Sequence, residues 1–348
     1  NSFFVVGYMH SGTSILQKVF ANHPEVYTPG GEVKFIEYLN RIQKEFKDLS
    51  DPSVKKQFVS RVFIWIKKGI DFHKFKTLDY KELNDRNLAD FEPRIEDDSD
   101  HLSIFFKALD FKAEKNGCSY WLEKSPNNLF YVSEILEKRP NSRFICIVRD
   151  PRDVVASKKT RFLTIDSGRY SEEKLALKRL EKKYSPFIDA ISWRSTVREI
   201  NNVALKYPDQ IKVIVYENLL SHPEREVTGL CDFLGLDFSS EILNLEFQNA
   251  ADPNMKRVKG INPNTSGRYK NVLTKPEIAL IQRLANSQMN LYNWQREKLS
   301  LGSKIISIQY DFKAIFQLID RLNARYKMMG WKNFYSFLQT QMRKTKAR

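Results

Sequence analysis

The sequence predicts an α/β protein in which a central parallel sheet is flanked by helices. Three strand-length apolar runs, at Phe3 to Gly7, Phe144 to Val148 and Ile211 to Tyr216, are separated by long stretches of helical periodicity. Strands that alternate with helical stretches indicate parallel pairing, because each crossover connection places a helix on a face of the sheet. The chain has 348 residues, which is enough for one large domain or two small ones.

The predicted helices carry apolar residues at intervals of three and four. They cover residues 13–21, 54–68, 102–115, 129–137, 172–207 and 224–234. Residues 250–273 are rich in Asn, Pro, Gly and basic residues, and they predict a long loop of the kind that often carries function. Helical periodicity returns after residue 276. We therefore expect one domain over residues 1–300 and a basic, aromatic, helical extension over residues 301–348 that packs on it.

Composition favours a folded protein with an anionic partner. The 57 Lys and Arg residues exceed the 42 Asp and Glu residues, which gives a net charge of +15. The 3 cysteines have no Cys-x-x-Cys spacing and the 5 histidines show no ligand spacing, so we expect neither a metal site nor a disulfide framework. A reducing, cytoplasmic location fits this cysteine usage best, although the chain begins at Asn1, as it would after trimming of an upstream segment.

The first strand runs into a segment that is typical of a phosphate-binding loop. Gly7 and Gly12 are five residues apart and are followed by Thr13 and Ser14, which matches Gly-x4-Gly-Lys-Ser/Thr except that Thr13 replaces the lysine. Backbone N–H groups and the helix dipole bind phosphate in such a turn. Because that lysine neutralises the β and γ phosphates, its replacement argues against an ordinary ATPase or kinase. The alternative is a plain strand-to-helix turn that needs glycine and a capping hydroxyl.

The strand from Phe144 to Val148 ends in a second candidate anion site. Arg149 follows the strand, and Asp150 and Pro151 are typical of a helix start. Ligands of open α/β sheets bind outside the carboxyl ends of the strands, so Arg149 and Ser157, two helical turns later, are placed to bind a second phosphate. A surface pair between Arg149 and Asp153 is the alternative.

Together the two segments resemble the sulfotransferase family, whose members use 3′-phosphoadenosine 5′-phosphosulfate (PAPS) as sulfuryl donor and release adenosine 3′,5′-bisphosphate (PAP). A Lys/Arg-x-Gly-Thr-Ser/Thr loop of that family binds the 5′-phosphosulfate, and the present loop is similar to it, with His10 in place of Lys or Arg. An Arg-Asp/Asn-Pro run with a serine six residues after the proline binds the 3′-phosphate, and the second segment matches it. The stretch that begins at Tyr216 is similar to the family's Tyr-Glu-Asp-Leu stretch, and residues 256–260 resemble its basic, donor-covering loop.

The resemblance covers residues 3–275 and implies a phosphate-loop-like sulfotransferase architecture without a metal. It assigns donor binding to His10, Ser11, Gly12, Thr13, Ser14, Arg149, Ser157, Tyr216, Arg257, Lys259 and Gly260.

Sulfuryl transfer to a hydroxyl needs a base for the acceptor proton and a cation for the charge on the leaving nucleotide. The stretch from Gly31 to Ile36 is similar to a Lys-Glu-x-x-Phe-Phe run of Golgi-type carbohydrate sulfotransferases, which assigns the role of catalytic base to Glu32. A solvated glutamate at a helix N-terminus is the alternative. A Glu-Lys-Ser-Pro run resembles the family segment whose lysine lies near the transferred group. The candidate cations are therefore Lys124 and, when protonated, His10.

We therefore expect a sulfotransferase that acts on a hydroxyl of a glycan, a glycolipid or another polar metabolite, with a small natural product or a tyrosyl group as the alternative acceptor. A kinase-like nucleotide-binding enzyme is a second class, which the replaced lysine disfavours. A non-enzymatic protein that binds nucleic acid or membrane is a third class. No nucleic-acid motif supports it, and we expect no nucleic-acid partner. The basic residues of the extension fit either a solvated face or a peripheral contact with membrane. The oligomeric state stays open.

Overall fold

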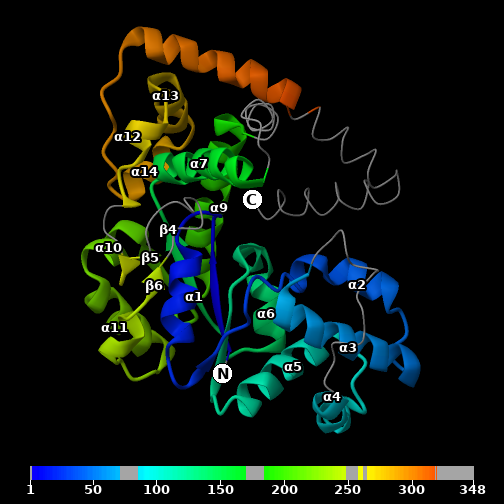
Figure 1. The fold of residues 1–348 in the computed structure, drawn as a ribbon. Helices are drawn as coiled ribbons and strands as arrows, with labels where there is room; N and C mark the ends of the chain where they lie inside the picture. The colour runs from blue at the N-terminus through cyan, green and yellow to red at the C-terminus, as the bar shows by residue number, and fades with distance from the viewer. Residues whose placement is uncertain are drawn as a thin grey trace.

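A computed structural model of the protein describes residues 2–70, 85–169, 184–247, 258–261, 265–317 and 319. Its centre is a five-stranded, all-parallel sheet with the strand order β2-β3-β1-β4-β5 (Figure 1). The strands of this sheet are β1 (Ser2–Gly7), β2 (Val26–Tyr27), β3 (Tyr120–Glu123), β4 (Arg143–Val148) and β5 (Ile211–Val215). The predicted fold class, a parallel sheet with flanking helices, is confirmed.

The helices occupy the long connections between the strands and the region after the last one. They are α1 (Thr13–Ala21), α2 (Leu39–Glu45), α3 (Pro52–Lys68), α4 (Asp85–Phe91), α5 (His101–Lys115), α6 (Val132–Lys138), α7 (Pro151–Arg169), α9 (Pro186–Lys206), α10 (Tyr216–Ser221), α11 (Pro223–Leu234), α12 (Tyr269–Val272), α13 (Lys275–Leu284) and α14 (Asn286–Leu291). Residues 301–317 are also helical. None of the helices in these described ranges combines the length and the apolar composition that crossing a bilayer requires.

Strand β1 forms the middle of the sheet and is buried on both faces. Because side chains alternate along a strand, Phe4 and Val6 enter one core and Phe3 and Val5 enter the other. In the register of β1 with β4, Gly7 lies opposite Ile147. The loops that follow the two strands therefore begin side by side, at the carboxyl edge where ligands of such sheets bind.

The prediction of one continuous helix over residues 172–207 is wrong. Tyr184 and Ser185 are not helical, and α9 begins at Pro186, with the Ser185 hydroxyl as its cap. Proline cannot continue a helix because it lacks an N–H and its ring meets the preceding turn, whereas it suits the first helical position. Residues 170–183 lie outside the described part of the chain.

The predicted loop over residues 250–273 contains regular structure at two places. Strand β7 (Val258–Lys259) pairs antiparallel with β6 (Glu246–Phe247), and α12 forms one further turn. Both elements are too short to produce a periodic pattern in the sequence. Residues 250–257 and 262–264 are outside the described ranges.

The predicted C-terminal extension is helical over residues 301–317 and lies beside α13 in Figure 1. Its packing differs from the expectation. Ser303, Ser307 and Ala314 are buried, whereas large apolar residues such as Phe312 and Phe316 are exposed. The boundary at residue 300 stays a prediction.

Candidate active site

The loop between β1 and α1 packs closely against β4 and α10. Gly12 has φ +103°, in the left-handed region, and a Cβ atom there would lie 2.4 Å from Cδ2 of Tyr216. His10 also has a positive φ, 68°, which is uncommon for a residue with a side chain. Ser11 between them is fully buried, and its N–H donates to the carbonyl of Tyr8. The loop thus holds its backbone in the tight turn expected before a phosphate-binding helix.

Arg149 links this loop to Thr265, which lies much later in the chain. Its guanidinium is buried and donates to the carbonyl oxygens of His10, at 3.0 Å, and of Thr265, at 2.6 Å. It lies 4.3 Å from the centroid of the Tyr216 ring, in a cation–π contact. The Tyr216 hydroxyl in turn hydrogen-bonds Thr265 Oγ1 at 2.7 Å. The two predicted phosphate motifs are therefore parts of one site.

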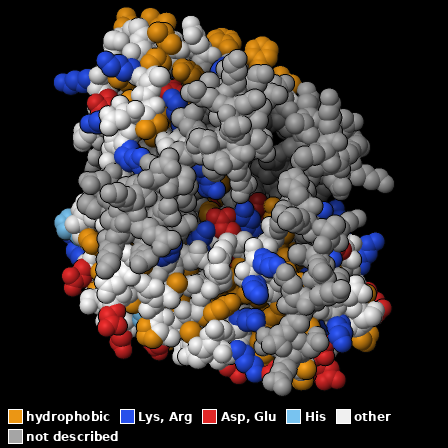
Figure 2. All heavy atoms as spheres, viewed as in Figure 1, with side chains coloured by type: hydrophobic (Ala, Val, Ile, Leu, Met, Phe, Trp, Pro, Cys, Tyr) orange, Lys and Arg blue, Asp and Glu red, His pale blue; other side chains and the backbone are white. Residues whose placement is uncertain are grey.

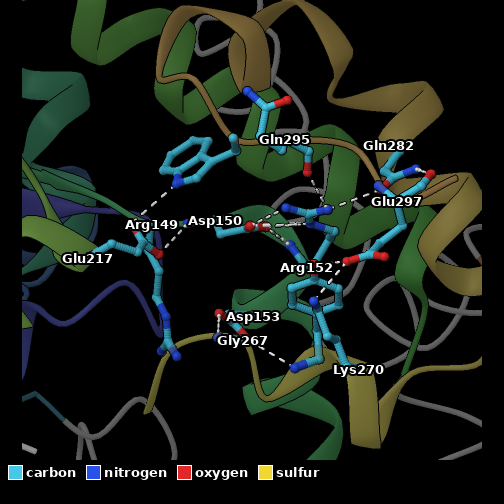
Figure 3. A network of polar contacts seen from close by, with 12 residues as sticks. Arg149, Asp150, Arg152, Asp153, Glu217, Gly267, Lys270, Gln282, Gln295 and Glu297 are labelled. Carbon is cyan, nitrogen blue, oxygen red and sulfur yellow. Dashed lines mark hydrogen bonds and ion pairs between the residues drawn. The ribbon is translucent and has the colours of Figure 1, made fainter. Parts of the chain in front are cut away.

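A polar network at the start of α7 fixes the backbone of Arg149, and Figure 3 shows the part of it that contains Asp150, Arg152 and Glu217. The indole of Trp193 donates to the Arg149 carbonyl at 3.0 Å, and the Asp150 N–H donates to Glu217 Oε1 at 3.1 Å. Burial raises the pKa of Glu217 to about 7. Arg152 pairs with Asp150 at 2.6 Å. Arg149 is consequently held by its backbone as well as by its guanidinium.

Asp153 does not form the alternative surface pair with Arg149. Its two carboxylate oxygens accept from the backbone N–H groups of Gly267, at 2.6 Å, and Tyr269, at 2.9 Å (Figure 3). Both Arg149 and Asp153 are buried. Asp153 therefore fastens the segment after Thr265 to α7.

Glu32 and Lys124 form the second part of the site. Lys124 Nζ lies 3.0 Å from Glu32 Oε1, and Lys34 Nζ lies 3.1 Å from Glu32 Oε2. Burial by itself would raise the pKa of Glu32, but the two ammonium groups outweigh it, so the pKa lies below its usual value. The carboxyl is therefore ionised at neutral pH. Figure 2 shows acidic and basic side chains next to one another in a hollow near the middle of one face of the molecule.

A buried carboxyl holds the backbone that carries Glu32. Glu123, at the end of β3, accepts from the Val33 N–H at 3.2 Å and from the hydroxyl of Ser125. The hydroxyl of Ser125 accepts from the Lys34 N–H at 2.9 Å. Burial raises the pKa of Glu123 to about 7. The two residues after Glu32 are thus attached to the ends of the segment that contains Lys124.

His10 contacts the first part of the site, and the charge of Glu32 in the second part acts on it. Its Nδ1 lies 3.3 Å from Ser157 Oγ, and its carbonyl accepts from Arg149. Burial, together with the charges of Arg161, Lys158 and Arg149, lowers the pKa of His10 to about 4, and the charge of Glu32 acts in the opposite direction. The imidazole is therefore neutral at pH 7. A bound anion would raise this pKa, because it adds negative charge beside the ring.

Comparison with known proteins identifies the family. The family model described as "Sulfotransferase family" matches residues 2–240, well over half of the chain. The chain belongs to the sulfotransferase family. The family resemblance that the sequence motifs carry is thereby confirmed.

A curated relative of this chain is named "Putative protein-tyrosine sulfotransferase" and comes from Caenorhabditis briggsae. It is 27% identical over 121 residues, which are 35% of the present chain and 39% of that protein. The chain thus spans about two fifths of the length of the curated relative it matches.

Two solved structures share the fold. The "Sulfotransferase Domain from the Synechococcus PCC 7002 Olefin Synthase" is 20% identical, covers 85% of this chain and 96% of its own, and has a TM-score of 0.52. The "Sulfotransferase Domain from the Curacin Biosynthetic Pathway" is 18% identical, covers 85% and 98%, and has a TM-score of 0.50. These likenesses confirm the predicted sulfotransferase architecture.

The donor end of the sulfotransferase site is suited to an anion. Ser11 Oγ and Arg149 Nε are buried and have no hydrogen-bond partner within the described part of the chain. Leaving a buried polar group unpaired costs about 1–3 kcal/mol, so such atoms mark a place where a ligand completes the bonding. Both atoms can donate. The residues present therefore fit a phosphorylated nucleotide.

The other predicted donor residues lie on α1, on β7 or directly after it, or outside the described residues. Thr13 is buried at the start of α1, and Ser14 is exposed. Gly260, with φ 79°, donates its N–H to the Leu245 carbonyl at 2.7 Å. Lys259 belongs to β7, and Arg257 lies outside the described residues. The roles of these residues in binding stay predictions.

Sequence reasoning missed three residues of the site. Thr265 had no signal in the sequence, because its partners are far away in the chain. Glu123 stood inside the Glu-Lys-Ser-Pro run, and Lys34 two residues after Glu32, but their contacts require the sheet to be folded. Across the ranges that the structure describes, no three His, Cys, Asp or Glu side chains gather as metal ligands would.

Proposed function

We propose that this sulfotransferase transfers the sulfuryl group of PAPS to an acceptor hydroxyl, with Glu32 as the general base. One observation carries the proposal: a buried, incompletely bonded guanidinium at Arg149 donates to the carbonyl of the loop residue His10, and the carboxylate of Glu32 lies close enough to His10 for its charge to act on that residue's pKa. The first group suits an anionic nucleotide, and the second suits a proton transfer at the other end of that nucleotide.

The donor end supplies several fixed contacts. Arg149 Nε and Ser157 Oγ are the groups that would bind the 3′-phosphate, and Ser11, Gly12 and the start of α1 would bind the 5′-phosphosulfate. When bound, PAPS supplies the activated sulfuryl group. The network around α7 holds Arg149 in position before binding, so little reorganisation is needed.

The acceptor end supplies a base and a cation. Glu32 would take the proton of the attacking hydroxyl on a carboxylate oxygen. Its low pKa keeps it ionised, and withdrawal of Lys124 towards negative charge on the donor would raise that pKa and make Glu32 a stronger base. Lys124 would stabilise the negative charge on the leaving nucleotide, because His10 is neutral at pH 7 until an anion raises its pKa.

The acceptor class follows from the surroundings of Glu32. A glycan, a glycolipid or another polar metabolite would present a hydroxyl, and the half-exposed Lys34 beside Glu32 favours an acceptor with nearby acidic groups. A tyrosyl hydroxyl is the second candidate. The identity with a relative that is named as a protein-tyrosine sulfotransferase supports it.

Transfer of label from radiolabelled PAPS tests the proposal. The panel contains carboxylated and neutral glycans, glycolipids, phenols, tyrosine peptides with acidic flanks, and amines. We expect label in a hydroxyl acceptor and a larger thermal shift with PAP than with ATP. Equal shifts with the two nucleotides, or transfer to none of the hydroxyl acceptors, would contradict the proposal.

A further inference from the structure

The helix over residues 301–317 turns its apolar side away from the protein. Leu301, Ile305, Ile308, Phe312, Ile315 and Ile319 recur at alternating intervals of four and three residues, and Phe316 adds to the same side. This spacing aligns them in one stripe along a helix. All seven are exposed: Phe312 by 64%, Phe316 by 69% and Leu301 by 72%.

The opposite side of the helix is the one that packs. Ser303, Ser307 and Ala314 are buried against the domain. Arg283 of α13 pairs with Asp311 at 2.8 Å, and Gln317 donates to the carbonyl of Tyr184 at 3.1 Å. Specific polar contacts therefore fix which side faces outward. A continuous exposed apolar stripe held in this way is typical of an interaction surface.

A basic groove runs beside the apolar stripe. It has a volume of about 710 Å³ and lies between α13 and the helix of residues 301–317. Its lining combines four cations, Arg283, Arg296, Lys298 and Lys304, and one carboxyl, Glu297, which pairs with Lys270, with Ile305 and Ile308 of the stripe. Among the residues that the structure describes, Arg296, Lys298 and Lys304 form no ion pair. The groove therefore joins cations that lack an anion to an apolar surface.

We propose that this surface binds an anionic lipid bilayer. The apolar stripe would enter the boundary between headgroups and acyl chains, and the groove would bind lipid phosphate. Figure 2 shows apolar side chains along the margin of the molecule where this helix lies, with basic side chains next to them.

Charge favours a bilayer over a second copy of the chain. Residues 301–348 contain ten Lys or Arg and two Asp. A second copy would bring the same positive charge to the contact, which opposes association, whereas an anionic headgroup layer neutralises it. The residues after 319 continue the same composition, with Trp331, Phe334, Tyr335 and Phe337 among basic residues. Aromatic side chains of this kind are typical of membrane interfaces.

Sedimentation of the 348-residue chain with lipid vesicles tests the proposal. We expect binding to phosphatidylcholine vesicles with about 30% phosphatidylserine, and at least about tenfold weaker binding to phosphatidylcholine alone. Phe312→Glu should reduce binding to the anionic vesicles by about tenfold or more, because a carboxylate enters the stripe. Leu205→Glu is the matched control, since Leu205 is an isolated leucine on α9 that is 83% exposed, and it should bind like the unaltered chain.

A substitution in the groove tests whether its cations contribute to vesicle binding. Lys298→Glu should weaken binding to anionic vesicles and make it less sensitive to salt, because one cation is lost from the contact. PAP binding should be unchanged in all three variants, which shows that they fold.

Three results would overturn the proposal. One is that the unaltered chain does not sediment with anionic vesicles. The second is a dimer in solution that Phe312→Glu dissociates, which would make a second copy the occupant. The third is that Phe312→Glu, unlike Leu205→Glu, lowers the melting temperature in the absence of vesicles, which would show that the chain itself covers the stripe.

Discussion

Replacement of Arg149 by alanine tests whether the donor is held through its 3′-phosphate. The guanidinium is buried, its only bonds among the described residues run to two carbonyl oxygens at 3.0 and 2.6 Å, and its Nε is unpaired. Truncating one partner of a buried, hydrogen-bonded charge pair costs about 2–5 kcal/mol. Ser157 would remain to bind the phosphate, so we expect the variant to lose about 2–4 kcal/mol of binding free energy. Its affinity for PAP would then be lower by about 30- to 1,000-fold.

Calorimetric titration with two nucleotides isolates this contribution. Arg149→Ala also removes two hydrogen bonds of the loop, so it is expected to weaken every nucleotide to some degree. The preference for PAP over adenosine 5′-phosphate reports the 3′-phosphate alone, and we expect most of this preference to disappear. Arg139→Ala is the matched control, because Arg139 is a partly buried arginine that pairs with Asp110 at 2.8 Å and contacts Ser2 at the start of β1, at the edge of the sheet opposite the loop. Its preference for PAP should stay within about twofold of the original.

A specific result would refute the reasoning. If Arg149→Ala weakens PAP and adenosine 5′-phosphate by the same factor, Arg149 supports the loop and does not bind the 3′-phosphate. The proposal that this site accepts PAPS would then lose its main support.

Three further changes give distinct expectations. Glu32→Gln should lower turnover by at least about a hundredfold with unchanged PAP affinity, because an amide does not take up the acceptor proton. His10→Gln should flatten the pH dependence of stability. The folded-state pKa of His10, about 4, is below its usual 6.5, so the unfolded chain binds more protons in this window. The unaltered protein should therefore lose up to about 3 kcal/mol relative to the variant as the pH falls from about 7 to 4, as followed by urea denaturation. Gly12→Ala should abolish PAP binding and lower stability by about 2 kcal/mol, because the new Cβ would meet the Tyr216 ring and the left-handed backbone disfavours alanine.

Each change has a control and a contradicting outcome. Glu37→Gln controls Glu32→Gln, since Glu37 accepts from Asn127 nearby, and a Glu32 variant with more than half of the activity would remove the base from the mechanism. Equal loss of stability in the His10 variant and the unaltered protein would show that His10 titrates normally. Gly229→Ala on α11 meets nothing within 4 Å and should be tolerated. Equal behaviour of Gly12→Ala would mean that the loop is not constrained.

The fold class and the two candidate phosphate-binding segments can be predicted from the sequence alone. Gly7, Gly12 and the Asp150-Pro151 pair are local signals, because a turn geometry or a helix start depends on the residues that form it. Short apolar runs likewise predict buried strands, even when the strands that pair with them are not known. Glu32 and Lys124 could be named individually, through resemblance to family motifs.

Which of these residues are in contact depends on the tertiary structure. Glu32 and Lys124 are 92 residues apart in the chain, and Arg149 and Thr265 are 116 apart, so their contacts exist only once β1, β3 and β4 pair. The neutral state of His10 also depends on the folded chain, because burial and the charges of Arg161 and Lys158 produce it. The C-terminal helix shows the same division most directly. Its periodicity fixes an apolar side and a polar side, but periodicity carries no information about which side the domain covers, and here the contacts of Asp311 and Gln317 leave the apolar side exposed.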